Sequence, residues 1–145
     1  MNASMQISSR PPAHAAVLLL SAAKLPTEDL TPAHFESFFY VGPDDSPTGL
    51  VGLELFGEVG LLRSLVVAPE RRGRGEGEAL LRHAEGQARA RGTRLLYLLT
   101  TTAEEFFTRR GYARAARDSA PVAIRQSREF AGICPASSTL MCRQL

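Results

Sequence analysis

The sequence predicts a mixed α/β domain in which helices flank one central sheet. Three observations support this fold class: strand-like and helical segments alternate along the 145 residues, a hairpin turn joins two neighbouring strands, and a buried strand leads directly into an amphipathic helix. The length suits a single domain over residues 1–145. A domain of this size buries roughly 68–70% of the surface of its unfolded chain, so it needs no disulfide or metal to fold.

The first half of the chain predicts one helix and three strands. Residues 12–24 read as the helix, which ends at Leu25-Pro26, and the aromatic run over 34–41 predicts the first strand. The runs over 50–56 and 61–67 predict two more strands joined by a tight hairpin turn. The longest apolar run is about half of a membrane span, so we expect no membrane partner.

The second half opens with the amphipathic helix, predicted over 75–91 and ended by Gly92. Its apolar residues recur at helical spacing, while Glu78 and Glu85 are predicted on the opposite, hydrated face. The continuous apolar run over 95–99 predicts a strand covered on both faces. The remaining predictions are a helix, a strand, a helix and a strand, over 103–110, 112–115, 121–130 and 138–143.

Composition and charge exclude several classes of protein. Apolar residues make up 44% of the chain and charged residues 22%, which argues against disorder and coiled coil. The net charge is +2, yet residues 1–62 carry −5 and residues 63–145 carry +7. All cationic side chains but one are arginine, which suits bidentate contacts to phosphate or carboxylate, or else reflects codon usage.

The two cysteines, Cys134 and Cys142, form neither a disulfide framework nor a C-x-x-C site. They favour reduced thiols in a cytoplasmic protein. The alternative is a secretory signal at Ala15–Ala23, which the sequence imitates only faintly because one basic residue precedes it. The histidines are scattered without ligand spacing, so we expect no metal site.

A strand, a glycine- and arginine-rich turn and a helix start follow one another and predict an anion site. The first amides of a helix lack intrahelical acceptors, and the helix dipole favours negative charge there. Glycines let the backbone approach a diphosphate closely. We expect the diphosphate on the amides of the glycine loop, Gly73–Glu78, and assign cofactor contacts to Arg72, Gly73, Arg74, Gly75, Glu76, Gly77 and Glu78.

The spacing of the glycine loop narrows the choice of ligand. Its pattern, G-x-G-x-G, differs from the dinucleotide pattern G-x-G-x-x-G, and no G-K-[ST] indicates a nucleoside triphosphate site. By elimination, coenzyme A is the best candidate. The alternative is a helix start whose basic residues are merely solvated.

Two motifs resemble the GNAT N-acetyltransferase superfamily. Val67-Ala68-Pro69 followed by Arg72-x-x-Gly75-x-Gly77 is similar to its acyl-CoA signature. Ala103-x-x-Phe106-Phe107-x-x-x-Gly111-Tyr112 is similar to its second CoA helix and the strand that follows. The resemblance covers residues 35–115 well. Four further segments resemble a bacterial subgroup, the arsenic-resistance N-acetyltransferases: 62–65, 96–103, 124–130 and 134–137.

The resemblance implies a fold, a co-substrate and a reaction. It implies a mostly antiparallel central sheet in which the strands over 61–67 and 95–101 splay apart, and direct transfer of an acetyl group from acetyl-CoA to an amine. The pantetheine arm would lie in this gap, and an amide near Val66 would polarise the thioester carbonyl. Members are often dimers, which implies a possible homodimer. The implied contacts to the arm come from Leu65, Val66, Val67, Thr101, Thr102 and Phe106.

The acid and base residues depart from the family's usual pattern. Phe107 stands where many members have a tyrosine that protonates the leaving thiolate, and the usual strand carboxylates are missing. Glu54 is a candidate catalytic replacement, although a solvated strand carboxylate is the commoner case. The alternative to an enzyme is a domain that binds CoA as a sensor.

Arg63 is the best lead for the acceptor, because it interrupts a strand otherwise built of Leu and Val. We expect Arg63, Arg125 and Arg128 together to bind an anionic or amino-acid-like small amine. Internal ion pairs with nearby glutamates are the alternative. A nucleic-acid-binding module is a further rival, which the acidic first part of the chain and the lack of a recognition motif argue against.

Overall fold

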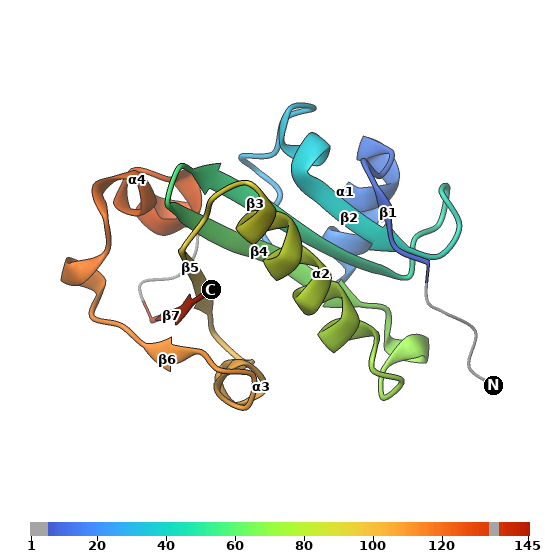
Figure 1. Ribbon diagram of the computed structural model, residues 1–145. Helices are drawn as coiled ribbons and strands as arrows, with labels where there is room; N and C mark the ends of the chain where they lie inside the picture. Colours follow the sequence, from blue (N-terminus) through green and yellow to red (C-terminus); the bar gives the residue numbers. More distant parts are fainter. Residues whose placement is uncertain (1–5, 134–136) are drawn as a thin grey trace.

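The computed structural model describes residues 6–133 and 137–145, and these contain one seven-stranded sheet in the order β1-β2-β3-β4-β5-β7-β6 (Figure 1). Every neighbouring pair of strands is antiparallel except β4 and β5, which are parallel. The predicted mixed, mostly antiparallel sheet is confirmed. The strands are β1 (Ser8–Ser9), β2 (Phe38–Val41), β3 (Gly49–Phe56), β4 (Val59–Val67), β5 (Leu95–Thr100), β6 (Ala113–Arg114) and β7 (Thr139–Gln144).

Helices cover both faces of the sheet (Figure 1). The core on one face holds side chains from α2 (Glu76–Ala90) and α3 (Glu104–Thr108). The cores on the other face hold side chains from α1 (Ala13–Ala22) and α4 (Val122–Arg125). Among the described residues, no helix combines the length and the apolar character that a bilayer crossing requires.

The apolar stripe of α2 lies where helical periodicity predicts it. Leu80, Leu81, Ala84 and Ala88 have no exposed surface, and burying each leucine contributes about 1.5–3 kcal/mol. Glu85 is a correction, because its carboxylate is also buried. Burial opposes its charge, but hydrogen bonds from neighbouring arginines and a tyrosine hydroxyl hold the pKa of Glu85 below its ordinary value.

The strand predicted over 34–41 is shorter in the structure. His34–Ser37 form a 3-10 turn, η1, and only the last four residues belong to β2. The reason is local, since Pro32 precedes the turn and the His34 ring nitrogen accepts the backbone N–H of Thr31 at 3.0 Å. A side chain that bonds nearby backbone in this way competes with the sheet ladder.

The helix predicted over 121–130 is interrupted. Its first part, α4, ends at Arg125, and a π-helical turn, η4 (Glu129–Ile133), follows. Ser127 causes the break, because its hydroxyl donates to the Ile124 carbonyl at 2.7 Å and accepts the Phe130 N–H at 3.3 Å. The break sets the direction in which Glu129 enters the site described below.

The central strands splay as the family resemblance implies. β4 and β5 pair only over Val59–Leu61 and Leu95–Tyr97. Farther along, β4 carries a bulge: three of its residues span the same distance as two on β3, and Ser64 adopts a left-handed φ of +61°. The bulge bends β4 away from β5 and opens a gap between them.

Candidate functional site

Two cavities meet in the gap between β4 and β5. The loop cavity, about 410 Å³, lies beside the glycine loop, and the Arg63 cavity, about 610 Å³, lies on the other side of the gap. Leu65, Ala103 and Phe107 line both cavities. A single elongated ligand can therefore extend from the glycine loop toward Arg63.

The glycine loop presents unpaired amides. Gly75 is the N-cap of α2 with a left-handed φ of +80°, a conformation that glycine adopts without steric cost. The first helical hydrogen bond runs from Ala79 N–H to the Gly75 carbonyl at 3.1 Å. Within residues 6–133 and 137–145, none of the amides of Gly73–Glu78 donates to a protein acceptor. These six unpaired donors are arranged as an anion site at a helix start requires.

The arginines of the loop differ in how far they are already paired. Arg71 is bound to the buried Glu76 carboxylate, with its Nη2 at 2.5 Å from Oε2. Arg72 is exposed and donates from Nε to the Val67 carbonyl at 3.2 Å. Arg74 is exposed and has no ion pair among the described residues. Arg72 and Arg74 therefore remain the cations available to an incoming anion.

The backbone of β4 indicates which amide near Val66 can polarise a thioester carbonyl. Ala68 N–H bonds the Thr48 carbonyl at 2.7 Å, and antiparallel strands alternate, so the backbone groups of Val66 face β3. Those of Leu65 and Val67 face the gap. The amide of Leu65, not that of Val66, is therefore the donor that can reach a carbonyl held there.

The threonines and the phenylalanine predicted to contact the pantetheine arm line different cavities. Thr101 and Thr102 are exposed and line the Arg63 cavity. The preceding Thr100 accepts the Ala103 N–H at 3.0 Å on its hydroxyl, one residue before α3 begins. Phe106 lines the loop cavity, where Gly77 lies against its ring.

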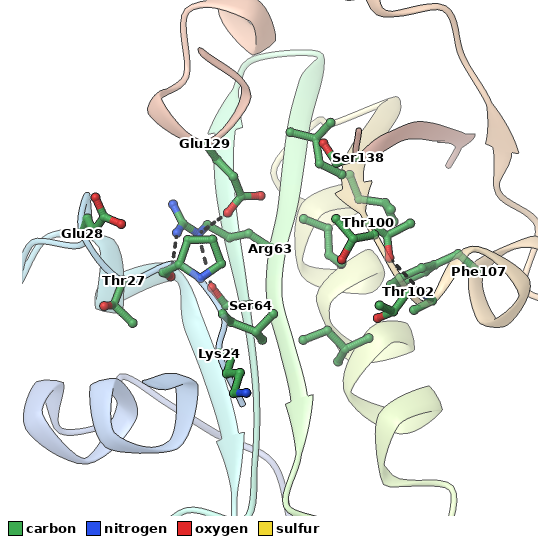
Figure 2. A pocket seen from close by; sticks show the side chains of 18 of the residues that line it. Lys24, Thr27, Glu28, Arg63, Ser64, Thr100, Thr102, Phe107, Glu129 and Ser138 are labelled. Carbon is green, nitrogen blue, oxygen red and sulfur yellow. Dashed lines mark hydrogen bonds and ion pairs between the residues drawn. The ribbon is translucent and has the colours of Figure 1, made fainter. Parts of the chain in front are cut away.

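Arg63 is enclosed by partners from four segments of the chain. Figure 2 shows two of them, Ser64 and Glu129, beside its side chain. Its side chain has no exposed surface, and all five of its N–H groups have an acceptor. No donor remains for a substrate carboxylate, so the predicted role of Arg63 in binding an anion is wrong and internal pairing holds instead. The acceptors are Asp29 at 2.5 and 2.9 Å, Glu54 at 2.8 Å, Ser64 Oγ at 3.2 Å and the Pro26 carbonyl at 3.5 Å. Glu129 adds an ion pair, with Oε2 at 3.2 Å from Nε.

The other predicted acceptor residues do not join this cluster. Arg125 and Arg128 are exposed and are not among the described residues that line the Arg63 cavity. Glu54, the predicted catalytic candidate, bonds Arg63 but does not line the cavity either. The structure thus separates the three predicted arginines and uses Glu54 to balance charge.

Sequence reasoning assigned no catalytic role to Glu129. Its side chain is 5% exposed, lines the Arg63 cavity and reaches the Nε of Arg63 at 3.2 Å. Burial, together with the charges of Glu54 and Asp29, raises the pKa of Glu129 to about 7 against the opposing charge of Arg63. The available signal was that Glu129 is the one acidic residue after Asp118.

Asp29, His34 and Glu54 have ligand-type atoms within 4.8 Å of one another. The guanidinium of Arg63 already supplies the cation there, and its charge and hydrogen bonds hold the pKa of Asp29 below the ordinary value even though burial opposes this. The cluster is therefore an ion-pair site. Cys142 is half-buried and hydrogen-bonded to Tyr97, and Cys134 lies outside the described residues.

Comparison with curated proteins finds amino-acid acetyltransferases. The chain is 46% identical over 63 residues to the amino-acid acetyltransferase of Ralstonia nicotianae, covering 43% of this chain and 14% of that protein. It is 33% identical over 90 residues to that of Neisseria meningitidis, covering 61% of this chain and 21% of the relative. The chain thus spans about a fifth or less of the length of these relatives.

Solved structures show the same fold. N-acetylglutamate synthase from Neisseria gonorrhoeae, complexed with coenzyme A and N-acetyl-glutamate, has a TM-score of 0.82 and 26% identity, covering 100% of this chain and 36% of that one. A GNAT-family acetyltransferase from Staphylococcus aureus has a TM-score of 0.72 and 16% identity, covering 98% of this chain and 99% of that one. The model of the acetyltransferase (GNAT) family matches residues 10–114. The chain belongs to the acetyltransferase (GNAT) family.

Proposed function

We propose that this chain is an N-acetyltransferase that transfers the acetyl group of acetyl-CoA to a small amine. One observation carries the proposal: the loop of free amides and the Arg63 cavity open onto the same gap, and the Leu65 amide faces that gap. An anionic carrier bound at the loop can therefore present its reactive end to a second ligand in the Arg63 cavity.

The residues of the loop cavity fit coenzyme A. The amides of Gly73–Glu78 suit its diphosphate, and the exposed Arg72 and Arg74 add charge. The backbone of Val67 faces the gap, and its carbonyl, now bonded to Arg72, suits an amide of the pantetheine arm. Bound acetyl-CoA supplies an activated acetyl thioester. The Leu65 amide then polarises its carbonyl, and alignment with the amine accounts for a large share of the rate.

The Arg63 cavity supports an amine as acceptor. Asp29, Glu54 and Glu129 surround a single guanidinium, and this excess of carboxylates favours a cationic ligand such as an ammonium. An amino-acid-like acceptor also needs a cation for its carboxylate. Lys24 lines this cavity, is exposed and has no ion pair among the described residues, so we assign that contact to Lys24.

The experiment has two stages. Thermal unfolding measured with acetyl-CoA at one hundred times its Kd should show stabilisation of about 2.7 kcal/mol, whereas acetyl-pantetheine, which lacks the diphosphate, should bind far more weakly. Thiol release is then measured over a panel of amino acids, alkylamines and, because of the arsenic-resistance resemblance, amino-acid-like toxicants. Absence of stabilisation overturns the proposal. Stabilisation without thiol release indicates a CoA sensor.

A further inference from the structure

One carboxylate of the Arg63 cavity is only half used by its ion pairs. Oε2 of Glu129 forms an ion pair with Arg63 Nε at 3.2 Å, while no group among the described residues donates to its Oε1. Asp29 differs because Arg63 occupies both of its oxygens. Glu28 also lines the cavity, but it is exposed. Glu129 is thus the buried carboxylate with an oxygen free to act in the cavity.

The fold holds this carboxylate in place. Glu129 opens the π-helical turn η4, two residues after Ser127, whose hydroxyl donates to the Ile124 carbonyl of α4. The next side chain, Phe130, stacks under the Arg117 guanidinium at 4.7 Å. In Figure 2, Glu129 extends to Arg63, with Thr100 and its neighbours on the other side of the view. The start of the turn is therefore anchored beside the cavity.

We propose that Glu129 is the general base of acetyl transfer, an inference that rests on the proposed function. Its free oxygen takes one proton from the ammonium of the acceptor, directly or through one water. The lone pair released on nitrogen forms the C–N bond to the thioester carbonyl carbon. The C–S bond breaks with its electron pair on sulfur, and the second nitrogen proton goes to the thiolate. Glu129 later returns its proton to water.

The charges around Glu129 suit this role. Arg63 on β4 holds one oxygen and fixes the orientation of the carboxylate. Asp29 and Glu54 lie on the same guanidinium, and His34 lies 4.0 Å from Glu54. Burial and the two carboxylates raise the pKa of Glu129 to about 7, which brings the base close to neutral pH.

The test compares Glu129→Gln with Glu36→Gln, a glutamate exposed on η1. With a strongly basic alkylamine, Glu129→Gln should lower kcat/KM about 10²- to 10⁴-fold and remove the ascending limb of the pH profile near pH 7. The Kd for acetyl-CoA should stay unchanged. With hydroxylamine, which is largely neutral at pH 7.5, the variant should approach the wild-type rate. Glu36→Gln should match the wild type throughout.

The outcomes separate the two proposals. A wild-type protein that acetylates no amine overturns the proposed function. If the wild type acetylates an amine and Glu129→Gln keeps both the wild-type rate and the ascending limb of the pH profile, only the role of Glu129 is overturned. An equal loss of rate with hydroxylamine and with the alkylamine also overturns this role. If Glu129→Gln does not fold, Glu129→Asp decides: the base role predicts a lower rate with the limb retained, and an unchanged rate refutes it.

Discussion

Arg63 and Asp29 form a buried bidentate pair, with Nη1 2.5 Å from one carboxylate oxygen and Nη2 2.9 Å from the other. Two parallel hydrogen bonds require the planar fork of arginine, which lysine lacks. The pair ties β4 to the segment that contains Pro26, and residues 24–28 form part of the wall of the Arg63 cavity. The same guanidinium therefore stabilises the fold and shapes the cavity.

Replacing Arg63 should strongly destabilise the protein. Arg63→Ala leaves three carboxylates near one another without their cation, and removing one partner of a buried pair costs about 3–5 kcal/mol. The stability of Arg63→Lys should lie between that of the wild type and that of Arg63→Ala, because the point charge of lysine cannot pair with all three carboxylates. Urea unfolding measures this difference. The exposed Arg128→Ala should stay within about 0.5 kcal/mol of the wild type. Equal losses at positions 63 and 128 would refute the structural role.

Glu129 should make stability depend on pH. Its pKa rises from 4.5 to about 7 on folding, so between these values the folded protein holds a proton that the unfolded chain has released. The free energy of unfolding should therefore fall as pH rises through this window, by on the order of 3 kcal/mol. Glu129→Gln should flatten this slope and gain relative stability above pH 7. Urea unfolding at pH 5 and pH 8 measures both, with Glu36→Gln as control; a slope unchanged by Glu129→Gln contradicts the assignment.

Two glycines of α2 allow the glycine loop to be tested separately from the stability of the helix. Gly77→Ala and Gly86→Ala should each stabilise α2 by about 0.5–1 kcal/mol. A Cβ at Gly77 lies 3.7 Å from both Val67 and Phe106 in the loop cavity, whereas one at Gly86 meets no atom within 4 Å. Only Gly77→Ala should weaken CoA binding. Calorimetry measures the two Kd values, and equal values would place the cofactor elsewhere.

The glycine loop could be predicted from the sequence because its parts are adjacent in the chain. A helix start, its free amides and its glycines occupy six consecutive residues, Gly73–Glu78, so local pattern is sufficient. The cluster around Arg63 is the opposite case. Asp29, Glu54 and Glu129 come from three distant segments, and only the folded sheet brings them together.

The errors in secondary structure and backbone direction have a related cause. Periodicity placed the buried stripe of α2 correctly but left Glu85 on the hydrated face, because its partners Tyr112 and Arg143 come from later segments of the chain. The sequence located the amide only as one near Val66, because the bulge at Ser64 and the pairing with β3 set which amides face the gap. Neither the partners of Glu85 nor the pairing of β4 with β3 leaves a local signature in the sequence.

Phe107 offers a test of the missing acid. Its ring is 6% exposed, lines both cavities and packs edge-to-face against Phe106 at 5.1 Å and Tyr112 at 5.6 Å. The family resemblance implies a tyrosine here that protonates the leaving thiolate. If the proposed function holds, Phe107→Tyr should raise kcat, by at most about 10²-fold, the lower end of what a positioned acid contributes.

The pH profile distinguishes this gain from a packing effect. A tyrosine acid must keep its proton, so the kcat of Phe107→Tyr should fall as pH rises toward about 10, the ordinary pKa of the phenol. Phe107→Leu changes the packing without adding a hydroxyl and should gain neither rate nor this descending limb. Should Phe107→Tyr behave like Phe107→Leu, the nitrogen proton reaches the thiolate without help from a phenol at this position. The Phe107 ring would then only exclude water from the pantetheine arm in the gap.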